Sequence, residues 1–198
     1  MKKIFALLLS AALLVTLLAA CGGGNTTDTD TDTQEPATDA STTQVEEQEP
    51  DTGDASKDDP LNQDEIGEKE LLVVSFGTSY NDSRRETIGA IEKAMQTAFP
   101  DYSVRRAFTS QIIIDHVKDR DGVTIDNVEQ ALERAVNNGV KTLVVQPTHL
   151  MNGLEYEELT DELAKYSDSF EKIAIGDPLL TSDADFEAVM TAITDATK

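Results

Sequence analysis

The sequence predicts an α/β domain over residues 66–198, with a parallel four-stranded sheet and helices on both faces. Four apolar runs, at 71–76, 102–108, 141–147 and 170–176, are each followed by a stretch with helical periodicity. Strands that alternate with helices need crossover connections, which make the strands parallel. The pattern is typical of a flavodoxin-like fold, in which the carboxyl ends of the strands share one edge and ligands bind there.

Helix boundaries follow from caps and glycines. Ser83 and Glu86 are spaced as a capping box, so the first helix is expected to begin at Ser83. Further helices are expected from residue 110 to Gly122, from 126 to 139 and from 154 to 166, with the last beginning at Ser182. This last helix is amphipathic, and four of its residues are expected to join the core: Phe186, Val189, Met190 and Ile193.

Residues 1–21 are typical of a bacterial lipoprotein signal peptide. Two lysines precede a short apolar stretch, and Leu18-Ala19-Ala20-Cys21 resembles the lipobox, whose cysteine becomes lipidated. The alternative for Cys21, the single cysteine, is a thiol buried in a core. We expect an extracytoplasmic protein that the bacterial cell membrane holds through a lipid anchor only.

Residues 22–65 are expected to form a disordered acidic linker. They contain fourteen acidic residues, one lysine and almost no large apolar side chains. Burial therefore offsets little of the entropy that ordering would cost. The Thr-Asp repeat lacks the glycine and the final glutamate of an EF-hand calcium loop. A solvated tether between membrane and domain is the interpretation that this composition favours.

Charge and motifs exclude several classes of function. The net charge of −22 on 198 residues excludes a general affinity for nucleic acid, which requires basic surface. The segment GTSYND lacks the features of a P-loop, and its single glycine does not make a dinucleotide fingerprint. The chain has no Gly-x-Ser-x-Gly segment, so a hydrolase of the nucleophile-elbow type is rejected.

Two residues in QPTHLMNGLEYEEL, at the expected ligand edge, are candidates for chemistry. Asn152 and Glu155 are spaced as an N-cap and its N3 partner, so Glu155 is either a capping residue or a functional carboxylate. His149 is either a hydrogen-bonded turn histidine or a functional one. The spacing alone leaves both alternatives open.

Basic residues near the same edge could bind an anion. Arg84 and Arg85 are expected in the first turn of a helix, where cations oppose the helix dipole. This placement indicates either a compensating anion or two solvated side chains. Arg106, in the second expected strand, is a further candidate donor.

Four segments at this edge together resemble one family. In this order and spacing, LLVVSFGTSYND, RAFTSQIIIDHVKDRDG, QPTHLMNGLEYEEL and GDPLL are similar to the anaerobic sirohydrochlorin cobaltochelatases of the CbiK type. The resemblance runs from about residue 70 to residue 198 and implies one half of a chelatase fold, in which two α/β halves enclose the macrocycle. It further implies an enzyme of cobalamin biosynthesis that inserts Co²⁺, or Fe²⁺, into a tetrapyrrole without ATP or an organic cofactor.

The resemblance also implies roles for individual residues. Glu155 would be a metal ligand, and His149 would act beside the macrocycle. The tetrapyrrole would lie on the loop formed by Ser75, Phe76, Gly77, Thr78, Ser79 and Tyr80. Because sirohydrochlorin is a polycarboxylate, we expect helix N-termini and Arg84, Arg85 and Arg106 to bind its carboxylates.

One departure from the family leaves three alternatives open. The family's two metal-site histidines lie in its second half, which has no counterpart here. Either the sequence is truncated, or the half-molecule pairs with another subunit as a homo-oligomer, or activity has been lost. The alternative function is a surface lipoprotein that binds tetrapyrrole or metal and performs no chemistry.

Overall fold

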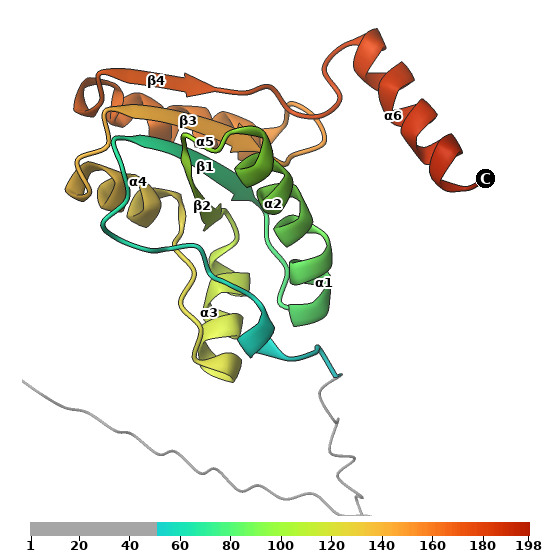
Figure 1. The fold of residues 1–198 in the computed structure, drawn as a ribbon, viewed down its shortest axis with the longest axis horizontal. Coiled ribbons are helices and arrows are strands. Elements are labelled where there is room, and N and C mark those ends of the chain that lie inside the picture. The colour runs from blue at the N-terminus through green and yellow to red at the C-terminus, as the bar shows by residue number, and fades with distance from the viewer. Residues whose placement is uncertain (1–50) are drawn as a thin grey trace, which may run out of the picture. The chain divides into compact units, whose positions relative to one another are not determined.

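A computed structural model describes residues 51–198 (Figure 1). The expected signal peptide, the lipidation site Cys21 and residues 22–50 of the expected linker lie outside the described residues. Over residues 51–198, no helix is both long and apolar enough to cross a membrane.

Four parallel strands form one sheet in the order β2-β1-β3-β4. They are β1 (Lys69–Ser75), β2 (Ser103–Phe108), β3 (Thr142–Pro147) and β4 (Lys172–Ile175). In β1 every residue after Lys69 is buried, as expected for a central strand of a parallel sheet. The predicted parallel four-stranded sheet is confirmed.

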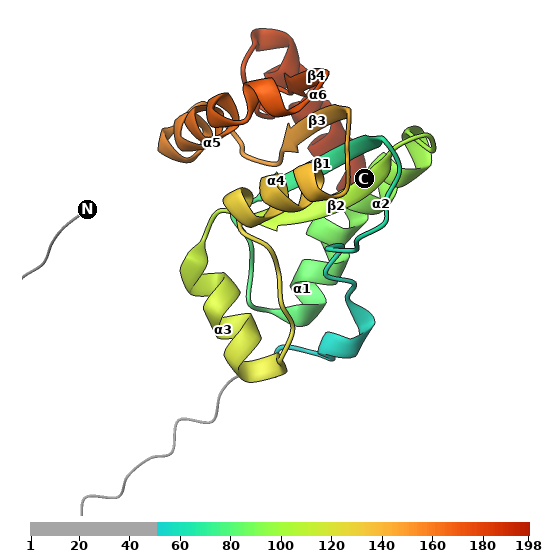
Figure 2. The same ribbon diagram turned by 90° about the vertical axis from the view of Figure 1, so that its left-hand side faces the viewer.

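Helices connect the strands and cover both faces of the sheet (Figures 1 and 2). They are α1 (Asn81–Glu86), α2 (Ile88–Ala98), α3 (Gln111–Asp121), α4 (Val128–Asn137), α5 (Leu154–Lys165) and α6 (Asp183–Ala196), with short 3₁₀ turns η1 (Ala55–Lys57) and η2 (Ser167–Ser169). Leu72 and Val74 of β1 face the main core, to which α4 and α5 contribute. Leu71 and Val73 face the opposite side, where Met95 of α2 packs.

The helix α6 differs from the sequence prediction in its packing. Its capping box between Ser182 and Asp185 is present, but none of its residues is buried. Phe186, Met190 and Ile193 are 50%, 61% and 62% exposed, and Figure 1 draws the helix clear of the sheet. The prediction that this apolar face, which includes the partly exposed Val189, joins the core is therefore wrong. Periodicity predicts an apolar face, but it does not predict what covers that face.

Residues 51–65, which we call the strap, pack against the domain. Leu61 is buried, and its carbonyl oxygen accepts a hydrogen bond of 3.1 Å from the Arg106 amide. The Thr52 carbonyl oxygen accepts another, of 2.9 Å, from the Asp82 amide. The prediction that all of 22–65 is a disordered linker is thus wrong for the strap, because polar contacts replace the apolar burial that its composition lacks.

Candidate active site

The loops after all four strands meet at the carboxyl edge of the sheet, as the parallel topology requires. The Thr109 amide donates to the Ser75 carbonyl oxygen at 2.9 Å, which joins the loops after β2 and β1. The Leu179 amide donates to the His149 carbonyl oxygen, also at 2.9 Å, which joins the loops after β4 and β3. The Thr148 amide, just after β3, donates to the Val74 carbonyl oxygen of β1 at 2.9 Å, so the four segments singled out in the sequence lie side by side.

Gly77 fixes the position of the loop that follows β1. Its φ is +102°, and a Cβ atom there would lie 2.6 Å from the ring of Phe108. The loop backbone thus lies directly on this buried ring, where only glycine fits. Phe76 and Tyr80, on either side, are about half exposed, so their rings are available to a ligand.

Two arginine side chains donate hydrogen bonds to the backbone of the same loop. Arg84 Nη1 donates to the Thr78 carbonyl oxygen at 3.1 Å. Arg120 Nη2, from the last turn of α3, donates to the Ser79 carbonyl oxygen at 2.6 Å. Ser75 is buried at the start of the loop and accepts a hydrogen bond from the Thr148 hydroxyl, so it joins two loops and does not present its hydroxyl to a ligand.

The structure does not support the predicted anion-binding role of the three arginines. Arg84 and Arg106 are 0% and 1% exposed, and both are paired with Asp58 of the strap. Arg106 also binds Glu92 through two hydrogen bonds of 2.7 Å. Arg84 and Arg106 are therefore unavailable to the carboxylates of a macrocycle.

Arg85 is more accessible but is also engaged, because it binds Asp82 and Glu86 on its own helix. The helix α1 begins at Asn81 with Tyr80 as its N-cap, so Arg84 and Arg85 lie in its last turn and not in its first. The predicted capping role of Ser83 is wrong for the same reason. Of the two alternatives for Arg84, the compensating anion is the one observed, and the protein supplies it as Asp58.

Glu155 lies in the first turn of α5 with its carboxylate exposed. The N-cap of this helix is Gly153, and no side chain caps it. Among the described residues, Glu155 accepts no hydrogen bond. The capping interpretation of Asn152 and Glu155 is therefore wrong, and the carboxylate is available to bind a metal.

His149 lies just after β3 and is half-buried. Both of its ring nitrogens are shielded from solvent and have no hydrogen-bond partner within residues 51–198. Burial lowers the pKa of the imidazole, and the negative charge of Glu155 partly opposes this shift. The structure thus holds a neutral imidazole near an exposed carboxylate.

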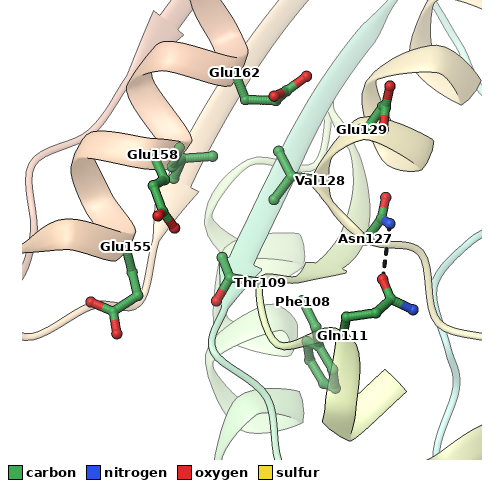
Figure 3. A pocket seen from close by; sticks show the side chains of 10 residues that line it. Phe108, Thr109, Gln111, Asn127, Val128, Glu129, Glu155, Glu158 and Glu162 are labelled. Atoms are coloured by element: carbon green, nitrogen blue, oxygen red, sulfur yellow. Dashed lines mark hydrogen bonds between the residues drawn. The ribbon is translucent and has the colours of Figure 1, made fainter. Parts of the chain in front are cut away.

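A pocket with acidic walls lies beside Glu155 (Figure 3). Glu155, Glu158 and Glu162 of α5 line one side of this pocket, and Asn127 and Glu129 at the start of α4 line the other; of the three glutamates, Glu162 points across toward α4. The lining includes no basic residue, so its potential favours cations. Over residues 51–198, however, no three His, Cys, Asp or Glu side chains gather as a metal site.

Sequence reasoning missed Glu158 and Glu162 as neighbours of Glu155. The signal was present, because positions three and seven residues after Glu155 lie on the same face of a helix. This spacing did not predict a pocket, because a dense acidic run on a helix is typical of a solvated surface.

Comparison with known proteins places the chain in a family. The sequence pattern of the cobalt chelatase (CbiK) family matches residues 69–198. The chain belongs to this family. It is 40% identical over 125 residues to the sirohydrochlorin cobaltochelatase of Salmonella typhimurium, a match that covers 63% of this chain and 47% of that relative. The resemblance inferred from the loop sequences is thereby confirmed.

The chain thus spans less than half the length of this cobaltochelatase relative. Among solved structures, a cobalamin (vitamin B12) biosynthesis CbiX protein from Marinobacter aquaeolei VT8 aligns with a TM-score of 0.42 and 12% identity, over 65% of this chain and 94% of its own. The cobalt chelatase match begins at Lys69, so the strap precedes it.

Proposed function

We propose that the chain inserts Co²⁺ into a tetrapyrrole resembling sirohydrochlorin, with no requirement for ATP or an organic cofactor. The observation that carries the proposal is the family match over residues 69–198, which includes every loop at the carboxyl edge of the sheet. The relative named a sirohydrochlorin cobaltochelatase supports this substrate class. Fe²⁺ is the second metal to test.

Exposed apolar side chains at this edge suit the flat faces of a macrocycle. They come from the loops after β1, β3 and β4 and from the start of α5: Phe76, Tyr80, Leu150, Met151, Leu154 and Leu179, each 48–67% exposed. Apolar side chains that gather on a soluble domain commonly mark a ligand surface. These side chains would contact the faces of the macrocycle, whereas its carboxylates need polar partners.

The carboxylates of the macrocycle need donors other than Arg84, Arg85 and Arg106, which are engaged by acidic side chains of the protein. The helices α3 and α5 both begin at this edge, and neither has a side-chain cap. Their first backbone amides therefore lack side-chain acceptors and carry the positive end of the helix dipole. We propose that these amides bind the acidic substituents.

Glu155 and His149 have complementary roles in the proposed reaction. When the metal enters, two pyrrole N–H groups lose their protons and the metal exchanges water for nitrogen ligands. Glu155 would bind the incoming Co²⁺ through its carboxylate. His149, neutral because burial lowers its pKa, would accept one of the two released protons, and the second would pass to solvent water.

A charge-neutralising substitution tests the role of Glu155. We expect Glu155→Gln to slow Co²⁺ insertion by about 10- to 100-fold or more, measured by the absorbance change of sirohydrochlorin on metallation. Glu158→Gln is the matched control, since it removes the same charge from the same pocket one turn along α5. Equal rates for Glu155→Gln and the unmodified protein would reject the ligand assignment. A shifted macrocycle spectrum without accelerated metallation would instead indicate binding alone.

The N-terminal segment supports a proposed location. We propose that Cys21 is lipidated and that the protein is anchored to the extracytoplasmic face of a bacterial membrane. The support is the sequence Leu18-Ala19-Ala20-Cys21 after an apolar stretch. Metabolic labelling with an alkyne fatty acid should mark the unmodified chain and not Cys21→Ser; equal labelling of the two would overturn the proposal.

The exposed face of α6 supports a proposed homo-oligomer. Phe186, Met190 and Ile193 form an apolar stripe that nothing in the described domain covers. The relative is about twice as long as the matched region, and a second copy of this chain would supply an additional α/β unit. Light scattering after size-exclusion chromatography measures the resulting mass; a monomer at all accessible concentrations would reject the proposal.

A further inference from the structure

Asp58, in the middle of the strap, is a buried carboxylate with three close hydrogen bonds. Its Oδ2 atom accepts from Arg84 Nε at 2.5 Å and from Arg106 Nη1 at 2.8 Å, and its Oδ1 accepts from Arg106 Nη2 at 3.1 Å. Its side chain is only 4% exposed. With Glu92, which binds Arg106, the cluster contains two carboxylates and two guanidinium groups, so its formal charge is zero.

Arg84 connects this cluster to the loop after β1. Its three nitrogens have three different partners: Asp58 through Nε, the Thr78 carbonyl oxygen through Nη1, and Asn81 Oδ1 through Nη2 at 2.5 Å. The guanidinium group is planar and rigid, so fixing one edge of it fixes the direction of the others. The position of Asp58 therefore determines where Arg84 holds the carbonyl of Thr78.

The strap is fixed on both sides of Asp58. Before it, the Gly53 carbonyl oxygen accepts from Asn81 Nδ2 at 3.1 Å. After it, the Leu61 carbonyl oxygen accepts from the Arg106 amide. These contacts reach α1 and β2, which flank the loop, so Asp58 is held by a docked segment and not by a mobile one.

We propose that Asp58 is a positioning residue for the macrocycle surface. Its carboxylate compensates the buried charge of Arg84, and Arg84 in turn fixes the loop of residues 77–80. The strap precedes residues 69–198, which the family match covers, so Asp58 lies outside that match. The consequence for substrate binding rests on the proposed function, whereas the effect on the loop does not.

Two substitutions interrupt the connection at different points. Asp58→Asn removes the charge that compensates Arg84. Arg84→Lys keeps a positive charge for Asp58 but has one terminal nitrogen, which cannot reach three partners of fixed geometry. Both variants are made in residues 22–198, and amide hydrogen exchange of the segment 77–81 is measured by mass spectrometry. We expect each to accelerate exchange there by about tenfold or more.

A control separates this local effect from general loss of stability. Leu163→Ala removes a core side chain near the end of α5, away from the loop, and leaves Asp58 and Arg84 intact. We expect it to raise exchange across the core without a preferential increase in residues 77–81. The double variant Asp58→Asn/Arg84→Lys should loosen the loop little more than either single change, since both act through one connection.

Titration of the same proteins with metal-free sirohydrochlorin tests the functional consequence. We expect the dissociation constant to rise about tenfold in Asp58→Asn and Arg84→Lys, with an unchanged KM for Co²⁺, and to change little in Leu163→Ala. Unchanged loop exchange in both variants overturns the positioning role. Faster loop exchange with unchanged macrocycle affinity overturns its functional part. If the unmodified chain itself does not bind the macrocycle, the proposed function fails, and loop exchange still decides the role of Asp58.

Discussion

The strap and α6, at the two ends of the described domain, reverse what their compositions predict. The strap is acidic and has one large apolar residue, Leu61, yet both Leu61 and the side chain of Asp58 are buried against the domain. The helix α6 has a regular apolar face and a complete capping box, yet no residue of it is buried. The polar segment is docked, and the amphipathic one is exposed.

This difference shows what apolar content does and does not determine. Burial of an apolar face lowers the free energy of the folded protein. The sequence of the face, however, does not show which surface packs against it. A polar segment can dock when its charges meet fixed partners, because a buried carboxylate that receives several hydrogen bonds retains favourable interactions. Asp58 meets that condition through Arg84 and Arg106.

A second buried carboxylate, Glu70 of β1, shows what happens when the pairing is weaker. Each of its oxygens lies 3.3 Å from Arg105 Nη1, and Oε1 has no hydrogen bond in the described domain. Burial raises the pKa of Glu70 to about 7; Arg105 opposes the shift, and the charge of Asp126 adds to it. For Asp58, burial acts in the same direction, but hydrogen bonds from Arg106 and Arg84 outweigh it and lower the pKa.

The largest expected effect is a pH dependence of stability that Glu70 causes. Between its unfolded pKa of 4.5 and its folded pKa of about 7, the folded state holds a proton that the unfolded state has lost. The free energy of unfolding therefore falls as pH rises through this interval, by on the order of 3 kcal/mol. Urea unfolding from pH 4.5 to 8 should show this decline, and Glu70→Gln should remove most of it.

The charges around Glu70 define the control for this experiment. Arg105 from β2, Asp126 before α4 and Arg134 from α4 form one cluster with Glu70. Glu68→Gln removes an exposed carboxylate two residues earlier, which binds Lys141, and should leave the decline in place. An identical pH profile for Glu70→Gln and the unmodified protein would show that Glu70 titrates normally in the folded state.

The next effect tests whether the strap is part of the stable domain. Leu61→Ala should lower the free energy of unfolding by about 2 kcal/mol, because it deletes a buried leucine side chain. Leu154→Ala, at a 67% exposed position on α5, is the matched control and should change it by less than about 0.5 kcal/mol. If urea unfolding shows that Leu61→Ala and Leu154→Ala lower the free energy of unfolding by the same small amount, the strap contributes nothing to the stability of the domain.

The sequence predicted the sheet well because its signal is local. The run LLVVSF is continuously apolar, and the strand that it forms is buried on both faces. The helix α3 ends at its C-cap Gly122 and α6 begins at its N-cap Ser182, both as predicted; Gly122 is left-handed, and the Ser182 side chain caps α6. Each of these features depends on a few neighbouring residues and can therefore be predicted from the sequence.

The site was predicted less completely because its charges have distant partners. Asp58 lies 26 residues from Arg84 and 48 from Arg106, in a segment whose composition indicated disorder. Sequence reasoning therefore assigned both arginines to the substrate. Glu155 and His149 lie after the carboxyl end of β3, the position in the fold that the sequence predicted, but the capping interpretation of Glu155 failed because α5 begins at Leu154, after Gly153.

The smallest expected effect on the free energy of unfolding is that of a substitution in α6, which directly tests the contrast between α6 and the strap. Met190 is 61% exposed in the isolated fold, so Met190→Ala should change the free energy of unfolding of dilute protein by less than about 0.5 kcal/mol. If a second copy covers this face, the same substitution should weaken self-association at higher concentration, because apolar contact is lost only in the assembly. Sedimentation velocity over a range of concentrations measures both species. A large loss of stability in the monomer would mean that α6 packs onto its own domain in solution, and the contrast with the strap would disappear.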